Sequence, residues 1–172
     1  MKIVLRQKIV SLLASYTASD EQGKAVSLIS QKFTVPASYE MLDAKGKLTY
    51  YLKGEIFNIK VEDEEGNVLY NIRPTKRIGL IFSKRWFNFL KKELSIYNAN
   101  GEKIGTAGGN WLAFSFKMKI NGEEVARVKK NIMAFTDKYL IDVTNTDYAD
   151  LALISTVIFD ALYNSSNQGR RR

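Results

Sequence analysis

Five short turns of similar composition divide most of the chain into segments in which apolar and polar residues alternate. Each turn places an Asp or Asn shortly before a Gly, and the five lie at residues 20–24, 43–47, 63–67, 98–102 and 121–123. Asp and Asn side chains can bond to the backbone two residues ahead, and Gly adopts a positive φ without a Cβ clash. Each turn therefore predicts a β-hairpin.

The segments between the turns have the two-residue period of β-strands. Phe57, Ile59 and Val61 alternate with polar residues before the third turn, and Val68, Tyr70 and Ile72 alternate after it. This period is typical of antiparallel sheets with one buried and one solvated face. The turns recur regularly except between the third and the fourth, where extra sequence is inserted and where we expect function.

One segment near the C-terminus follows a helical pattern instead. We expect a helix from Asp147 to Tyr163, with Thr146 as its N-cap and acidic residues in its first turn. Apolar residues lie almost all round it, so it must be enclosed, with Leu153, Ile154, Val157 and Ile158 buried. The segment is short for a membrane span, and Asp160 would be costly in lipid. The expected fold is mainly β: a closed antiparallel barrel around this helix.

The absence of Cys and His narrows the possible chemistry. The chain lacks a thiolate nucleophile, a Cys-type zinc site and the usual general base near neutral pH. An enzyme would have to use carboxylate, Lys, Tyr or Ser chemistry. We therefore expect no enzyme, no cofactor, no metal site and no catalytic residue.

The organisation of the chain indicates one cytoplasmic domain. Lys2, Arg6 and Lys8 interrupt the apolar N-terminus, so a secretory signal peptide is not expected, and no apolar stretch is long enough to span a membrane. We expect a single domain at 1–164 and a flexible basic tail at 165–172. The net charge is +8, of which the tail supplies three arginines. This balance permits attraction to phosphates or anionic lipid.

Several segments together resemble the LURP-one-related family. They are Gln7-Lys8-Ile9-Val10-Ser11 leading to Tyr16, the repeated hairpins, and Lys138-Tyr139-Leu140-Ile141-Asp142-Val143 before the apolar helix. The resemblance covers nearly the whole chain. It implies the tubby C-terminal fold, a barrel of about twelve strands around a hydrophobic C-terminal helix, which has also been proposed for phospholipid scramblases. Tubby itself binds phosphoinositide headgroups through basic residues on the barrel surface, which makes phosphoinositide-like ligands an expectation by analogy.

The inserted segment from Arg73 to Lys92 is rich in cations and aromatic residues and contains no acid. Such a mixture suits an anionic membrane surface, where each Lys or Arg contributes about 1 kcal/mol. It also suits nucleic acid, although no RNA-binding motif supports that partner. The alternative is two ordinary strands with solvated cations. The predicted ligand-binding residues are Lys76, Arg77, Lys84, Arg85 and Trp86.

Three other patterns have structural explanations. The acids of Glu62–Glu65 could hold calcium, but they lack EF-hand spacing and suit a solvated hairpin tip. Gly105, Gly108 and Gly109 do not form a dinucleotide fingerprint, so close packing or a bulge is expected. The aspartates at 142, 147, 150 and 160 could suggest paired catalytic carboxylates, but no partner can be assigned.

Three classes of function remain. The first is a binding module that contacts anionic lipid, a phosphoinositide-like ligand or another phosphorylated small ligand, as a cytoplasmic protein peripheral to the membrane. The second is a structural or regulatory scaffold that binds another protein. The third, which the composition disfavours, is a hydrolase based on carboxylate or Lys chemistry.

Overall fold

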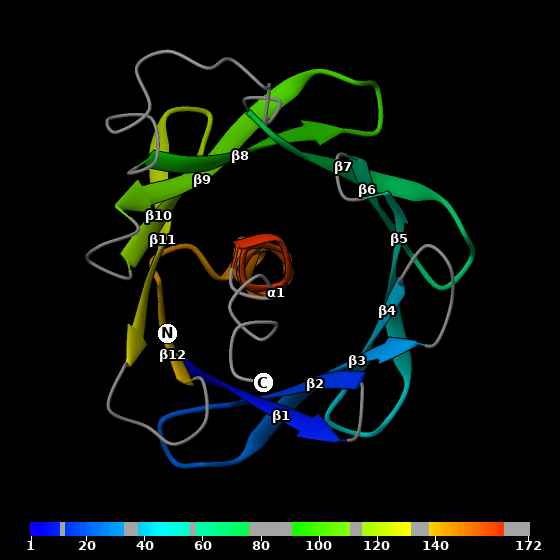
Figure 1. The fold of residues 1–172 in the computed structure, drawn as a ribbon, viewed down its shortest axis with the longest axis vertical. Helices are drawn as coiled ribbons and strands as arrows, with labels where there is room; N and C mark the ends of the chain where they lie inside the picture. The colour runs from blue at the N-terminus through cyan, green and yellow to red at the C-terminus, as the bar shows by residue number, and fades with distance from the viewer. Residues whose placement is uncertain are drawn as a thin grey trace, which may run out of the picture.

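A computed structural model describes residues 1–10, 13–32, 38–55, 58–75, 91–110, 115–131 and 138–163. Within these residues, twelve strands form one closed antiparallel barrel, as predicted (Figure 1). Each strand pairs with its neighbours in sequence, and β1 pairs with β12 to close the ring. The strands are β1 (Lys2–Val10), β2 (Leu13–Ser19), β3 (Ala25–Lys32), β4 (Ser38–Asp43), β5 (Leu48–Glu55), β6 (Asn58–Glu62), β7 (Val68–Pro74), β8 (Lys91–Asn98), β9 (Lys103–Asn110), β10 (Ser115–Ile120), β11 (Glu123–Asn131) and β12 (Lys138–Val143).

The five predicted hairpin turns are confirmed, and they lie together at one end of the barrel, here called the turn end. In the second turn, the Asp43 side chain accepts hydrogen bonds from the backbone N–H groups of Lys45 and Lys47, at 2.8 and 2.9 Å. The last turn contains only Asn121 and Gly122, with φ of 51° and 87°. These positive angles are those of a type I′ turn, which explains why the Asn-Gly pair occurs there.

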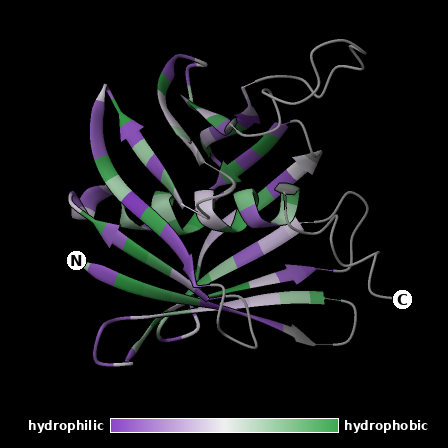
Figure 2. Ribbon diagram, turned by 60° about the vertical axis from the view of Figure 1, so that its left-hand side comes forward, coloured by the Kyte–Doolittle hydropathy of each residue, from purple (hydrophilic) through white to green (hydrophobic). Residues whose placement is uncertain are grey.

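The C-terminal helix lies inside the barrel. Figure 1 looks down the ring and shows α1 (Ala149–Tyr163) surrounded by strands, and Figure 2 shows the same helix from the side. Leu153, Ile154, Val157 and Ile158 are each at most 1% exposed, so the predicted enclosure is confirmed. In the C-terminal half of the helix, Phe159 stacks on Phe116 of β10 with ring centroids 4.5 Å apart.

The predicted start of the helix was wrong in detail. Residues Thr146–Tyr148 form a short 3₁₀ turn before α1, and the cap is Asn145, whose side chain accepts a hydrogen bond from the Asp147 N–H. Thr146 is therefore not the N-cap. Asn145 has an extended backbone and an acceptor oxygen two residues before the donor, which is the usual capping arrangement.

Each strand contributes inward-facing apolar side chains that pack around α1. Burial alternates along the strands, as in β10, where Phe116, Met118 and Ile120 are buried between exposed lysines. The same sheet therefore supplies an apolar lining and a polar outer surface. Inward residues that are at most 2% exposed include Ile3, Leu5, Ile29, Met41, Leu52, Val61, Ile72, Leu94, Ile96, Met118, Val128 and Ile141.

The glycines of β9 allow close approach of β10, as expected. A Cβ at Gly109 would overlap the Ser115 carbonyl oxygen and crowd the Phe116 Cα, and one at Gly105 would overlap the Lys119 carbonyl oxygen. These glycines serve backbone packing rather than phosphate binding.

Only the ends of the predicted functional segment at 73–92 belong to the described structure. β7 ends at Pro74 and β8 begins at Lys91, and both positions lie at the end of the barrel opposite the turns, here called the loop end. Lys76, Arg77, Lys84, Arg85 and Trp86 lie outside the described residues, as does the predicted tail at 165–172. In the described part of the chain, no helix is long and apolar enough to cross a membrane.

Candidate functional site

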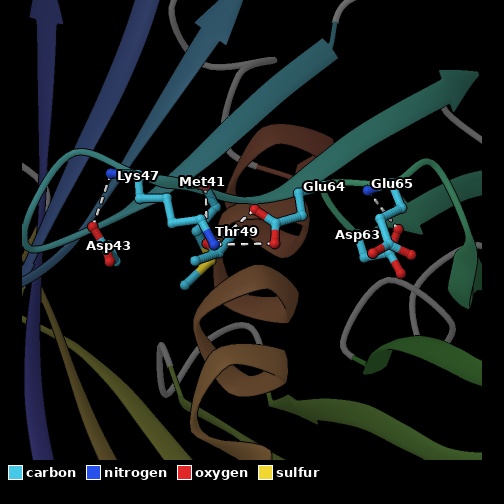
Figure 3. Close-up of polar contacts among 7 residues, drawn as sticks. All are labelled: Met41, Asp43, Lys47, Thr49, Asp63, Glu64 and Glu65. Carbon is cyan, nitrogen blue, oxygen red and sulfur yellow. Dashed lines mark hydrogen bonds and ion pairs between the residues drawn. The ribbon is translucent and has the colours of Figure 1, made fainter.

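The acids of the hairpin tips are used by the turns themselves (Figure 3). The carboxylate of Asp63 accepts hydrogen bonds from the N–H groups of Glu65 and Asn67, at 3.0 and 2.8 Å. Glu64 forms an ion pair with Lys47 of the neighbouring hairpin at 2.9 Å. Across the described ranges, no group of three or more acidic side chains has the arrangement of a metal site. The acidic turn at 62–65 is thus a solvated hairpin tip.

A polar contact supports the first turn of α1. The Tyr50 hydroxyl donates a hydrogen bond to Asp150 at 3.3 Å. Burial raises the pKa of Asp150, and burial together with the nearby carboxylate raises the pKa of Tyr50 to about 12. Asp150 also lies at the positive end of the helix dipole. This pair joins the start of the helix to the barrel wall.

A larger polar cluster surrounds Asp160, near the other end of α1. Tyr16 donates to its Oδ2 at 2.8 Å, Tyr139 donates to its Oδ1, and the Lys130 ammonium lies 4.0 Å from Oδ1. Gln7 in turn donates to the Tyr16 hydroxyl at 3.1 Å. The Asp160 side chain is 2% exposed, so the carboxylate is removed from water and depends on these donors. The cluster joins the helix to β1, β2, β11 and β12.

The chemistry of the Asp160 cluster is that of an anchor. Burial, and then the negative charge of Asp160, raise the pKa of Tyr16 well above its usual range and that of Tyr39 to about 12. These phenols therefore remain protonated at neutral pH and act as hydrogen-bond donors rather than as bases. Within the described part of the molecule, no buried side-chain nitrogen or oxygen lacks a partner. The arrangement is suited to fixing the helix in place.

The outer surface of β11, β12 and β1 offers a different kind of site. Lys129, Lys138, Arg6 and Lys8 lie on the outward side of these strands, toward the loop end. Arg6, Lys8 and Lys129 are exposed and Lys138 is half-buried. We call these four cations and the Leu140 side chain between them the basic face.

Strand pairing brings these cations together. Lys138 of β12 is directly opposite Arg6 of β1, and Lys129 of β11 is opposite Leu140, which is itself opposite Val4. Side chains in such positions have Cβ atoms about 5 Å apart, and like charges there destabilise the sheet. The fold therefore concentrates positive charge at a cost to its own stability.

The basic face differs from the cations beside it in lacking acidic partners. Toward the turn end, Lys117 and Arg127 both form ion pairs with Glu124, each at 2.7 Å. Lys2 pairs with Glu21 at 3.2 Å. None of the four cations of the basic face forms an ion pair with any described residue. Within the described part of the barrel, no acid neutralises their charge.

The two described cations of the predicted segment have their own contacts. Arg73 donates to the Asn58 side chain at 3.0 Å and lies over the Tyr97 ring, 4.9 Å from its centroid. Lys92 is partly buried, and this burial lowers its pKa. The structure thus does not test the predicted site and identifies a second group of cations that sequence reasoning missed. The sequence did contain a signal, because cations such as Arg6 and Lys8 occupy alternate positions of a strand. That signal could not be used, since the pairing that brings these cations beside those of other strands was unknown.

Comparison with known proteins gives the family of the chain. The model of the LURP-one-related family matches residues 1–160, which include every described strand and most of α1. The chain belongs to the LURP-one-related family. This LURP-one-related chain is similar to the crystal structure of an Arabidopsis thaliana protein, at 16% sequence identity and a TM-score of 0.64. The match covers 93% of this chain and 91% of that protein, and it supports the barrel fold. Among curated proteins, no relative matches this sequence.

Proposed function

We propose that this protein is a non-enzymatic binding module that attaches to anionic phospholipid surfaces. The observation that carries the proposal is the basic face, where Arg6 and Lys138 are directly opposed and form no ion pair with a described acid. An arrangement that costs stability without an internal counter-charge is expected where an external anion supplies the compensation.

The charge of the whole chain supports the same function. The net charge is +8, and the described acids of β11 and β12, which are Glu123, Glu124 and Asp142, lie toward the turn end of their strands. Among the described residues of β1, β11 and β12, unpaired positive charge is thus concentrated toward the loop end. An anionic bilayer attracts each nearby Lys or Arg by about 1 kcal/mol, so four cations suffice for reversible binding.

Two other classes of function have less support. A protein-interaction scaffold would be expected to show a large apolar patch, whereas the described surface has three exposed large hydrophobic residues, Met1, Leu28 and Leu140. A hydrolase would need a carboxylate available to substrate. The buried Asp160 and the half-buried Asp150 are both bonded to tyrosines of the barrel.

Vesicle co-sedimentation tests the proposal. The protein should pellet with phosphatidylcholine vesicles that contain phosphatidylserine or a phosphoinositide and should remain in solution with phosphatidylcholine alone. Binding should weaken as salt is raised, because charge attraction is screened within about 8 Å at physiological ionic strength. Absence of binding to anionic vesicles at low salt would refute the proposed function.

The predicted contribution of 76–86 stays a prediction and can be tested in the same assay. Replacing both Lys84 and Arg85 with Glu should reduce binding if that segment contacts lipid, and should leave the melting temperature nearly unchanged. Unaltered binding would place the whole contact elsewhere on the barrel.

A further inference from the structure

Apolar side chains are exposed at and beside the basic face. Leu140 is 44% exposed and lies between Lys129 and Val4 on neighbouring strands. Leu28 is 37% exposed and is opposite Thr17, which is opposite Arg6. Both exposed leucines of the described surface therefore lie within two strands of β1.

A second apolar residue extends this region. Leu42 of β4 is directly opposite Leu28 and is half-buried, and neither belongs to the core around α1. The outer surface from β11 to β4 thus presents the four cations with aliphatic side chains on either side of β1. A solvated barrel wall would normally carry polar residues at these outward positions.

From this combination we infer that the barrel docks on the bilayer side-on, with β1 at the centre of the contact and Leu140 and Leu28 entering the headgroup region. This inference rests on the proposed function and adds the contact surface and the orientation. Arg6, Lys8, Lys129 and Lys138 bind lipid phosphates around the leucines. The axis of the barrel then lies along the membrane surface rather than pointing into it.

The chemistry of the face favours lipid over nucleic acid. Single-stranded nucleic acid is usually held by aromatic side chains on which the bases stack. The apolar side chains among these cations are aliphatic, namely the exposed Leu140 and the half-buried Val4, with the exposed Leu28 beyond Thr17. Aliphatic groups surrounded by cations match the boundary between acyl chains and anionic headgroups.

A charge reversal with a matched control tests the contact surface. Arg6→Glu places opposite charges on paired strands, so the melting temperature should stay the same or rise. Vesicle binding should nevertheless weaken by about thirtyfold, since two charges are altered and each contributes about fivefold. Lys60→Glu is the control, because Lys60 is also exposed and also opposite a lysine, Lys53, but lies on the far side of the ring. Both variants change the net charge equally, and Lys60→Glu should bind within about threefold of the parent.

Site-specific labels test the orientation. The natural chain has no cysteine, so single substitutions Leu140→Cys, Leu28→Cys and Lys60→Cys each provide one attachment point for an environment-sensitive fluorophore. On addition of phosphatidylserine-containing vesicles, the emission of labels at 140 and 28 should shift to shorter wavelength, while that of the label at 60 should not change.

The outcomes separate this inference from the proposed function. If the parent protein binds anionic vesicles but the labels at 140 and 28 do not respond, or Lys60→Glu weakens binding as much as Arg6→Glu, side-on docking is wrong and lipid binding stands. If the parent fails to bind vesicles, both proposals fail. Binding of short single-stranded DNA in preference to vesicles would overturn the lipid assignment and support a nucleic-acid surface.

Discussion

Asp160 is a buried carboxylate held by groups that are far apart in the sequence. Its hydrogen bond to Tyr16 joins residues separated by 144 positions, and that from Tyr139 joins the helix to the last strand. Burying a charge costs several kcal/mol unless it is paired and hydrogen-bonded. The buried carboxylate is therefore stable only in the closed barrel. The helix must also lie at one position along the barrel axis and in one rotation about its own axis, because only then do the donors reach Asp160.

Removal of this carboxylate should destabilise the fold. Asp160→Ala leaves Tyr16, Tyr139 and Lys130 without their shared acceptor, so the free energy of unfolding should fall by about 3–5 kcal/mol. Asp160→Asn keeps the shape and one acceptor oxygen and should cost less. Urea denaturation measures both, with Asp142→Asn on the exposed side of β12 as a control that should change stability by less than about 0.5 kcal/mol. Equal stability of Asp160→Ala and the parent would show that the cluster is not an anchor.

At the scale of elements, α1 takes the place of a second layer of secondary structure. Most sheets bury their apolar face against such a layer to form a hydrophobic core. Ten consecutive residues, Leu151 to Asp160, are buried, so no face of the helix in this stretch meets water. Since the barrel has no other described element inside it, the helix supplies the apolar surface on which all the strands pack.

A charge in the middle of this helix should therefore prevent stable folding. Ile154→Asp places an unpaired carboxylate at a position that is 1% exposed, and the cost of several kcal/mol is a large part of a typical stability margin. Truncation after Thr144 should likewise leave insoluble protein. Solubility and cooperative thermal unfolding measure both effects, and a truncated chain that melts cooperatively would contradict the role given to α1.

The close approach of β9 to β10 predicts different losses of stability for alanine substitutions at two neighbouring glycines of β9. A Cβ at Gly109 meets the backbone of β10, which cannot move without breaking strand pairing, so Gly109→Ala should cost about 1–3 kcal/mol. At Gly108 an added Cβ would lie 2.8 and 2.9 Å from the Cγ and Cβ of Glu93 and 3.1 Å from the Lys92 carbonyl oxygen, whereas at Gly109 it would lie closer still to the Ser115 carbonyl oxygen. Because the overlap is smaller, Gly108→Ala should cost less. Comparison of their midpoints of urea unfolding checks the difference, and equal midpoints would rule out a backbone clash.

At the scale of the whole molecule, buried tyrosines should make stability depend on alkaline pH. An unfolded chain loses tyrosine protons near pH 10, whereas Tyr39 and Tyr50 in the folded barrel keep theirs to about pH 12. Between these values the unfolded state binds fewer protons, so the free energy of unfolding falls as pH rises. The contribution of these tyrosines is fully present below pH 10 and is lost through pH 12.

Urea unfolding from pH 7 to 11, with tyrosinate absorbance recorded in parallel, measures this dependence. Stability should begin to fall near pH 10, and Tyr39→Phe should make the fall shallower by removing one of the linked protons. If the folded protein showed the absorbance change of all its tyrosines at the ordinary pKa, the buried phenols would not be linked to folding.

Local pattern determined much of the architecture. The Asp or Asn before each Gly defined the reversals, and the two-residue period defined which side chains of each strand face inward. The apolar residues that lie almost all round the segment at 151–159 required a helix enclosed by protein. These features depend on residues close in sequence, where backbone preference and burial act together. The exact cap, Asn145 in place of Thr146, depended on a 3₁₀ turn that the pattern does not distinguish from α-helix.

The contacts between distant segments were decided only by closure of the barrel. Arg6 is opposite Lys138, and Tyr16 reaches Asp160, because β1 pairs with β12 in one register around one helix position. A shift of one residue in either strand would turn the basic face inward and the core residues outward, and burial of the apolar lining prevents that shift. The amino-acid order thus specified inward and outward positions on each strand, while the closed ring selected which outward cations became neighbours.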